Sequence, residues 1–371
     1  MKNGMTALAS AVALGLGLSG AVQAQNDSIL IGVQVPTTGS EATYGQDMYN
    51  AAELAAEELN AEGGVLGMDI ELINGDSACD PQQSVNAAGN LVSRGVQGIV
   101  GGYCSGATMP TLKVYGDEGL PFVITASNST QLIPANPGNA FMINSTGADQ
   151  SKKAVDFFES QGVERLAIID QGDSYSQDLA DLTAERWESM GHEVVRETVN
   201  KGEQDFSAVV SNVRSNDVDA VFWTAYYADG GLLIRQLRQG GYRDIIAVGD
   251  GSNSPQLFEI AGGAAEGVYA FSNPTAEFLP AAASFIENYR AEYGQDPGPY
   301  APLNYDGLKL LAWAMEEAGT TDPAAVVDAL ASADGESWLT GPISFTDENT
   351  LARSNFIILE GEDGAWTYFE N

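Results

Sequence analysis

The stretch Ser28-Ile29-Leu30-Ile31-Gly32-Val33-Gln34-Val35 is a nearly continuous apolar run that ends at Pro36. Such a run, without polar alternation, is typical of a β-strand that is buried on both faces of a sheet. Residues 47–61 follow after a polar loop and carry apolar side chains at helical spacing, and Gly63 and Gly64 end that helix. The opening of the chain therefore predicts a strand, a loop and a helix of an α/β fold.

The same alternation of apolar runs and helical periodicity continues through residue 261. It is the pattern of βαβ units, and the strands outnumber those that one parallel sheet normally holds. We therefore predict an α/β fold of two doubly wound parallel-sheet lobes. The expected strands after the first are 68–73, 97–101, 120–125, 141–144, 165–170, 193–199, 220–224, 245–248, 343–345, 355–359 and 366–369. The expected helices after the first are 81–94, 107–118, 149–161, 176–190, 205–214, 230–239, 255–261, 281–293, 300–317 and 323–330.

Three stretches rich in turn residues are the expected crossovers between the lobes. They lie at residues 144–148, at 272–274 and near 350–354. We predict that lobe 1 consists of residues 25–146 and 274–353, and that lobe 2 consists of residues 147–273 and 354–371.

The N-terminus has the three parts of a secretory signal peptide. Lys2 supplies the basic start, residues 6–20 form a short uncharged run, and small residues precede an expected cleavage after Ala24. Residues 15–20 match the dinucleotide pattern G-x-G-x-x-G, but they lie inside the segment that is removed. No later stretch approaches 18 apolar residues, so we expect residues 25–371 to form a soluble exported protein.

The composition excludes several classes of protein. The chain holds 51 Asp and Glu residues against 16 Lys and Arg, which gives a formal net charge of −35. Nucleic-acid binders and polybasic membrane-surface proteins need a basic face, so neither class fits. The single histidine, His192, rules out a multi-histidine metal site and leaves one imidazole for any catalytic triad. We predict no metal and no cofactor, and we interpret the acidic excess as a surface property of a soluble protein or a saline habitat.

The chain has two cysteines, Cys79 and Cys104. An even number of cysteines in an exported protein favours a disulfide. Two free buried thiols, or one catalytic cysteine, are the alternative interpretations.

Candidate ligand-binding residues follow the predicted strands, because ligands of parallel sheets bind beyond the carboxyl ends of the strands. Residues 101–108 lead into a helix, and the N-terminus of that helix can hold a ligand carboxylate. Ser105 can donate a hydrogen bond from its hydroxyl to this carboxylate, or it can be the N-cap of the helix. Residues 125–130 form a small polar loop that offers carbonyls to an ammonium, or is an ordinary surface loop. Asp250 follows another strand and can pair with a cation. Tyrosines at loop positions suit the walls of a pocket, namely Tyr44, Tyr175, Tyr226, Tyr227 and Tyr300.

Several segments resemble the leucine/isoleucine/valine-binding proteins, which are type I periplasmic solute-binding proteins of ABC importers. The most specific are residues 77–85 (SACDPQQSV) with 101–105 (GGYCS), and residues 59–67 (LNAEGGVLG) match a motif of the wider family. The resemblance spans nearly the whole chain after the signal peptide. It implies two lobes joined by three crossovers, one amino acid bound in the cleft, and a Cys79–Cys104 disulfide.

The resemblance also implies roles for individual residues. Ser105 falls where the family holds the ligand carboxylate, and Asp250 falls where a Glu of the family holds the ammonium. Ala126 and Asn128 fall where a backbone carbonyl and a Ser or Thr hydroxyl contact the ligand head group. The aromatic wall positions are Tyr44, Tyr175, Tyr226 and Tyr300, and Tyr103 stands where an aliphatic residue is common. The departures at Asn128, Asp250, Tyr103 and Tyr300 argue against a strictly aliphatic pocket.

The resulting prediction is a periplasmic substrate-binding component of an ABC importer rather than an enzyme. It would act as a monomer, bind a branched-chain or similar apolar or aromatic amino acid between its lobes, and deliver it to the inner-membrane ABC permease. A carrier of amides, urea or aromatic compounds and a ligand-sensing domain are the alternatives. A periplasmic hydrolase is disfavoured because no nucleophile–base set is found.

Overall fold

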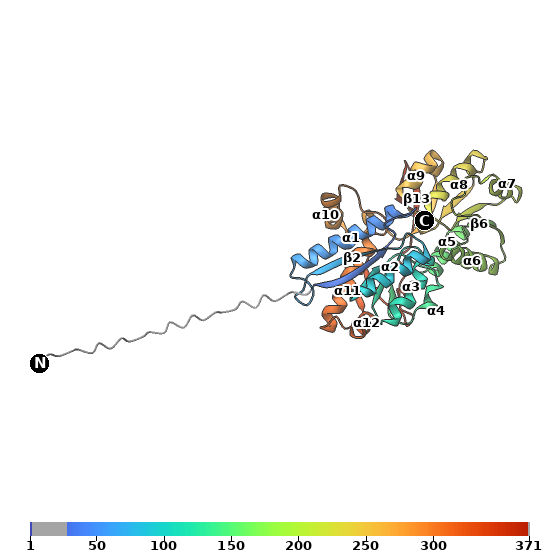
Figure 1. Cartoon of the computed structure of the whole chain (residues 1–371). Helices are drawn as coiled ribbons and strands as arrows, with labels where there is room; N and C mark the ends of the chain where they lie inside the picture. The colour runs from blue at the N-terminus through green and yellow to red at the C-terminus, as the bar shows by residue number, and fades with distance from the viewer. Residues whose placement is uncertain (2–27, 370–371) are drawn as a thin grey trace.

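The computed structural model describes Met1 and residues 28–369, whose main strands lie in two sheets (Figure 1). The opening strand β1 (Ile29–Val35) lies inside the first sheet, and its side chains are almost all buried, as its apolar run predicts. The predicted signal peptide, with its cleavage after Ala24, lies outside the described residues.

The first sheet has five parallel strands in the order β2-β1-β3-β4-β5. Helices α2 and α3 pack on each other over one part of the sheet, while α1 packs on α11, which returns from late in the sequence (Figure 1). Leu91 of α2 and Leu311 of α11 fill the spaces beside Gly32 and Gly98 of the sheet. The remaining elements on this side are α1 (Ala42–Ala61), β2 (Ile70–Asp76), α2 (Pro81–Ser93), β3 (Gly98–Gly101), α3 (Ser105–Asp117), β4 (Phe122–Ile124), α4 (Leu132–Ala135), β5 (Ala140–Met142), α10 (Ala283–Tyr293), α11 (Ala301–Ala318) and α12 (Pro323–Ala331).

The second sheet has seven strands in the order β14-β13-β10-β9-β8-β6-β7. Helices α5 and α6 pack together, as do α8 and α9, and α5 also contacts β10. The elements are α5 (Gly147–Ser160), β6 (Arg165–Asp170), α6 (Ser174–Ser189), β7 (Glu193–Thr198), α7 (Ser207–Ser215), β8 (Ala220–Trp223), α8 (Tyr227–Gln239), β9 (Ile245–Val248), α9 (Pro255–Ala261), β10 (Val268–Ser272), β13 (Ile357–Glu362) and β14 (Ala365–Tyr368).

The fold is the predicted α/β class, with parallel sheets covered by helices, and three details differ from expectation. Strand β10 was absent from the prediction, although it is the neighbour of β9 in the sheet. The last strands, β13 and β14, run antiparallel to their neighbours, so the second sheet is mixed. A separate hairpin joins β11 (Asp334–Ser337) to β12 (Pro342–Ser344).

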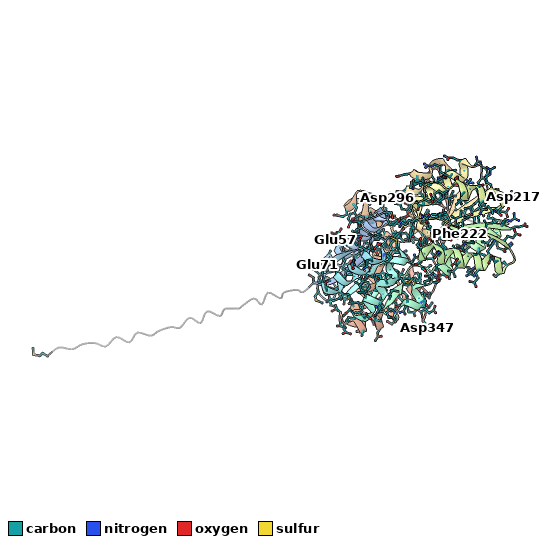
Figure 2. The ribbon with its side chains drawn as sticks, turned by 45° about the vertical axis from the view of Figure 1, so that its right-hand side comes forward. Glu57, Glu71, Asp217, Phe222, Asp296 and Asp347 are labelled. Atoms are coloured by element: carbon teal, nitrogen blue, oxygen red, sulfur yellow. A yellow bond between two sulfur atoms is a disulfide. The ribbon has the colours of Figure 1, made fainter. Side chains whose placement is uncertain are left out.

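The acidic excess lies mainly at the surface of the described residues. The labelled carboxylates in Figure 2 lie at the edge of the molecule and are exposed, whereas Phe222 is buried; they are Glu57, Glu71, Asp217, Asp296 and Asp347. Within the part of the chain that the structure describes, no helix is both long and apolar enough to cross a bilayer.

Candidate functional site

A small, nearly filled cavity of about 10 Å³ lies where the carboxyl ends of the two sets of parallel strands meet. Its lining comes from the loops after β3, β4, β8 and β9, from the start of α6, and from the residue before α11. The lining residues are Tyr103, Ala126, Asn128, Tyr175, Tyr226, Asp250, Gly251 and Tyr300. Seven of the ten residues that the sequence analysis named for ligand binding or for the pocket wall are therefore in this list, and Ser105, Tyr44 and Tyr227 lie outside it.

Asp250 is the most polar group of the cavity, and it is held by neutral donors. The Tyr175 hydroxyl donates to its Oδ1 at 2.7 Å, and Gln150 Nε2 donates to the same oxygen at 3.0 Å. Asn128 Nδ2, which comes from the other sheet, donates to Oδ2 at 3.1 Å. These contacts fix the carboxylate at the junction between the two sheets.

Asp250 is only 1% exposed and forms no ion pair among the described residues. Burial raises the pKa of its carboxyl group above the ordinary value, and the hydrogen bonds from Tyr175 and Gln150 oppose that shift. A buried carboxylate with neutral donors alone carries a desolvation cost that a bound cation would offset. The arrangement is therefore suited to a ligand ammonium.

The loops after β3 and β4 face Asp250 from the five-stranded sheet. The Ala126 carbonyl accepts a hydrogen bond from Asn144 Nδ2 at 2.5 Å, so one acceptor of this loop is already engaged. Helix α3 begins at Ser105, two residues before the predicted start, and its N-cap is Cys104. The interpretation of Ser105 as the N-cap is therefore wrong. Its hydroxyl oxygen instead accepts from the Ser129 backbone N–H at 3.3 Å, which joins the two loops.

Five buried tyrosines form one cluster around the cavity. The Tyr103 ring lies 5.1 Å from that of Tyr44, 5.3 Å from that of Tyr300 and 6.1 Å from that of Tyr226, measured between centroids. Tyr175 joins the cluster at 5.4 Å from Tyr226. Burial raises the pKa of each phenol well above its usual value, so all five remain neutral hydroxyls near neutral pH.

Hydrogen bonds close the cleft around this cluster. The Tyr44 hydroxyl donates to the Asn253 carbonyl across the junction at 3.0 Å. Because its hydroxyl is engaged there, Tyr44 contacts the tyrosine cluster but does not line the cavity. Thr130, from the five-stranded side, donates from its backbone N–H and its hydroxyl to Asp178 of α6 at 2.7 and 2.6 Å. The structure therefore describes a closed arrangement of the two sheets.

Two contributors to the site were missed by the sequence analysis. Gln150 lies within α5 and connects Asp250 to the Phe271 carbonyl, to which it donates at 2.6 Å. Its position on a helix face gave no signal. Gly251 lies so close to Tyr175 that a Cβ there would stand 2.9 Å from the ring. The glycine that follows Asp250 was a usable signal, because close packing at this point excludes side chains.

The disulfide between Cys79 and Cys104 is confirmed, and it ties the loop before α2 to the start of α3. The Cα atoms of the two cysteines lie 5.4 Å apart. Because Cys104 stands between Tyr103 and Ser105, the disulfide supports the loop that carries both of these predicted residues.

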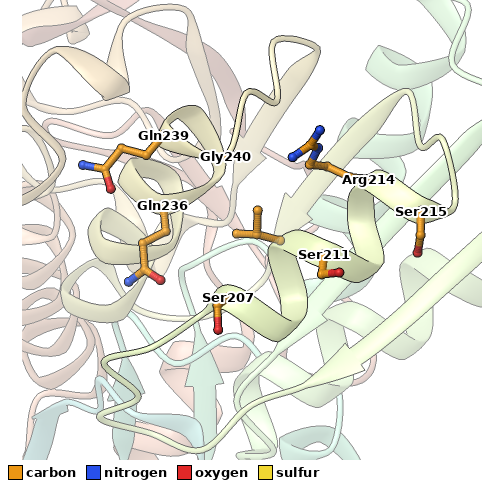
Figure 3. Close-up of a pocket in the computed structure, with 8 residues that line it drawn as sticks. Ser207, Ser211, Arg214, Ser215, Gln236, Gln239 and Gly240 are labelled. Carbon is orange, nitrogen blue, oxygen red and sulfur yellow. The ribbon is translucent and has the colours of Figure 1, made fainter.

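A more open hollow lies between α7 and α8, away from the junction of the sheets (Figure 3). Its labelled residues are Ser207, Ser211, Arg214, Ser215, Gln236, Gln239 and Gly240. Its charged residue, Arg214, is exposed, whereas the closed cavity is lined by the buried Asp250. Among the described residues, no group of three or more His, Cys, Asp or Glu side chains is arranged to hold a metal ion.

Comparison with known proteins decides the family. The model of the periplasmic binding protein family matches residues 28–365. The chain belongs to this family. The Leu/Ile/Val-binding protein homolog 2 of Brucella abortus is 31% identical over 350 residues, which cover 92% of this chain and 93% of the relative. The resemblance seen in the sequence is thereby confirmed.

Solved structures of family members agree with the fold. A leucine-binding protein, LivK, from Thermotoga maritima has a TM-score of 0.87 at 25% identity and covers 92% of this chain and 98% of its own. The LivJ substrate-binding protein of a branched-chain amino acid transporter from Streptococcus pneumoniae, solved with isoleucine, has a TM-score of 0.84 at 26% identity and covers 91% and 97%. The chain is thus a periplasmic binding protein whose relatives include carriers of branched-chain amino acids.

Proposed function

We propose that this chain is the periplasmic substrate-binding component of an ABC importer and that it binds an amino acid in the cavity between the two sheets. The observation that carries the proposal is Asp250, a buried carboxylate that neutral donors from both sides of the junction hold in place. In this function it receives the ligand ammonium. The relatives named for leucine, isoleucine and valine support an amino acid as the ligand class.

The ligand carboxylate would lie at the start of α3. No side chain caps this helix, and the Ser105 hydroxyl stands at its first residue. Backbone N–H groups and the helix dipole favour an anion at such a position. The α-ammonium and α-carboxylate would then contact opposite sides of the cleft, so the ligand itself would hold the two sides together. Closure is favoured only if the closed form binds the ligand more tightly than the open form.

We propose that the moving units are lobe 1, residues 25–146 and 274–353, and lobe 2, residues 147–273 and 354–371. The hydrogen bonds at the crossovers support these boundaries. Asn273 Nδ2 donates to Asn144 Oδ1 at 2.7 Å, and the Ser145 hydroxyl donates to Asn355 Oδ1 at 2.7 Å. The three crossovers are therefore linked side by side, as a common hinge requires.

Titration calorimetry on the purified chain tests the ligand class. The panel contains zwitterionic and basic amino acids together with acetamide, urea and benzoate. Binding of an amino acid is expected, whereas binding of only urea or acetamide would contradict the proposal. The tyrosine wall favours one alternative, a carrier of aromatic compounds, and binding of benzoate alone would support it. Uptake of the labelled ligand by cells with and without the chain tests delivery to a permease.

The substitution Asp250→Asn tests the ammonium contact. Loss of the charged partner of a buried cation costs about 2–5 kcal/mol, so the Kd for an amino acid is expected to rise roughly 30-fold or more. Asp306→Asn is the matched control, because Asp306 is also buried but accepts its hydrogen bonds from Leu339 and Thr340, outside the cavity. An unchanged affinity in Asp250→Asn, with normal folding, would remove Asp250 from the site.

A further inference from the structure

A second buried carboxylate, Glu41, lies beside the cleft and was not among the predicted ligand-binding residues. It stands directly before α1, in the loop that follows β1, and it is fully buried. Its side chain does not cap the helix, and neither of its carboxylate oxygens has a hydrogen-bond partner among the described residues. Buried polar groups are almost always paired, so an unpaired carboxylate needs an explanation.

The surroundings of Glu41 place it beside the tyrosine cluster. The Tyr227 hydroxyl, from the opposite side of the cleft, donates to the carbonyl of the adjacent Ser40 at 3.4 Å. Burial is the main cause of the raised pKa of the Tyr44, Tyr103 and Tyr226 phenols, and the charge of Glu41 adds to it in each case. The carboxylate is therefore within electrostatic reach of three tyrosines of the cluster.

The charged groups that face Glu41 across the cleft are Lys201, Asp173 and Asp229. Burial raises the pKa of Glu41, the Lys201 ammonium opposes this shift, and the two aspartates add to it. Lys201 forms no ion pair with Glu41, and its Nζ lies 5.4 Å from the centroid of the Tyr226 ring. Asp173 accepts from the first backbone N–H groups of α6, and Asp229 accepts from the Gly202 N–H, so both aspartates have partners. Glu41 has none.

Two further buried atoms in this region lack partners, namely the Tyr103 hydroxyl and Gln171 Oε1. Gln171 follows β6 and donates from its amide nitrogen to Asp229. Together with the two oxygens of Glu41, the region thus offers four unpaired oxygens that can receive N–H groups, because a phenol oxygen accepts as well as donates. A ligand with an aliphatic side chain would leave all four unpaired, whereas a side chain with several N–H donors can satisfy them.

We propose that Glu41 is a second ligand-binding carboxylate, which receives the positively charged side chain of a basic amino acid. The inference rests on the proposed function, because the α-ammonium and α-carboxylate are assigned to Asp250 and the start of α3. The cation would lie between Glu41 and the tyrosine rings, whose faces also attract positive charge. The ligand then brings two cationic groups to two buried carboxylates, and its α-carboxylate to a helix N-terminus.

A matched pair of ligands tests the proposal, because lysine and norleucine share a carbon chain and differ in the terminal ammonium. Calorimetry with the mature chain is expected to show that lysine, ornithine or arginine binds at least 30-fold more tightly than norleucine. In Glu41→Gln the affinity for the basic amino acid should fall at least 10-fold, while the affinity for norleucine stays the same or rises. Glu57→Gln is the control, because Glu57 is an exposed residue of α1, the helix that follows Glu41 (Figure 2).

Other outcomes would overturn the proposal. If leucine or norleucine binds more tightly than every basic amino acid, Glu41 does not select the ligand, although the proposed function stands. If neither class binds, the proposed function itself fails. If Glu41→Gln and Lys201→Gln weaken both classes equally, the two residues instead pair to hold the cleft closed. Glu41→Asp keeps the charge, and it supplies the comparison if the glutamine variant does not fold.

Discussion

Asp47 provides a test of how burial controls the stability of this fold. It lies in α1, is 5% exposed, and accepts hydrogen bonds from the Tyr289 hydroxyl at 2.7 Å and the Gly298 N–H at 2.8 Å. These contacts hold the segment that leads to Tyr300. Burial raises the pKa of the Asp47 carboxyl from 3.8 to about 6, although the same hydrogen bonds oppose the shift. The folded chain therefore holds the proton of this carboxyl group more tightly than the unfolded chain does.

The size and the sign of the effect follow from that shift. A difference of roughly 2 pKa units corresponds to about 3 kcal/mol. Because the folded pKa is the higher one, the folded chain binds the proton more tightly than the unfolded chain. The stabilising contribution is fully present below pH 3.8 and is lost as the pH rises through about 6. Asp47→Asn stays neutral throughout, so the difference in free energy of unfolding, wild type minus variant, should fall by about 3 kcal/mol between acidic pH and pH 8.

Urea unfolding followed by tryptophan fluorescence, at intervals from about pH 3 to pH 8, measures this difference. Other carboxylates titrate in both proteins and cancel from it. Asp347→Asn is the control, since it removes a carboxylate that is exposed (Figure 2). Asp306→Asn should reproduce the effect, because burial raises the pKa of Asp306 to about 6 as well. A difference between wild type and Asp47→Asn that stays constant across this range would refute the reasoning.

Two further predictions concern the whole chain. Reduction of the Cys79–Cys104 disulfide, which spans 25 residues, should lower the free energy of unfolding by about 3–4 kcal/mol on the chain-entropy model. Urea unfolding with and without reductant measures this change. An unchanged midpoint would show that the loop is held by its packing alone. Because the chain has a net charge of −35, salt should screen the repulsion between its surface carboxylates and raise the urea midpoint between 0.05 and 1 M NaCl. A midpoint that does not rise would argue against strong repulsion.

The fold could be predicted where the apolar pattern was unambiguous. Strands β6 and β9 and helix α9 have the predicted bounds, because turn residues and Pro255 limit them sharply. Strand β10 was missed although four of its five residues are apolar or aromatic, because the run is short and ends in a predicted crossover. The antiparallel direction of β13 and β14 was not predictable, because an apolar run shows that a strand is buried but not which neighbour it pairs with.

The site was predictable to the extent that its residues follow strands. Asp250, Asn128, Tyr103 and Tyr226 follow strands and meet in one cavity, as the topology requires. The loop positions expected for Tyr44 and Tyr175 were wrong, because these residues lie within α1 and α6. Gln150 joins them from within a helix, and only the packing of α5 beside β10 brings it to Asp250. The alternative interpretation of Ser105 as the N-cap was wrong because helix α3 begins one residue earlier than that interpretation requires, whereas its predicted contact with a ligand carboxylate stays a prediction.

The acidic composition and the charge of the ligand are separate questions. Exposed carboxylates are screened by salt over about 8–10 Å, so the surface charge of this chain steers ligands weakly at physiological ionic strength. A buried carboxylate is screened far less, and the loss of its hydration must be offset by a specific partner. Asp250 and Glu41 are both at most 1% exposed and form no ion pair among the described residues. In the proposed roles these two groups set the charge that the ligand must carry, whereas the exposed carboxylates contribute mainly to solubility and to the response of the fold to salt.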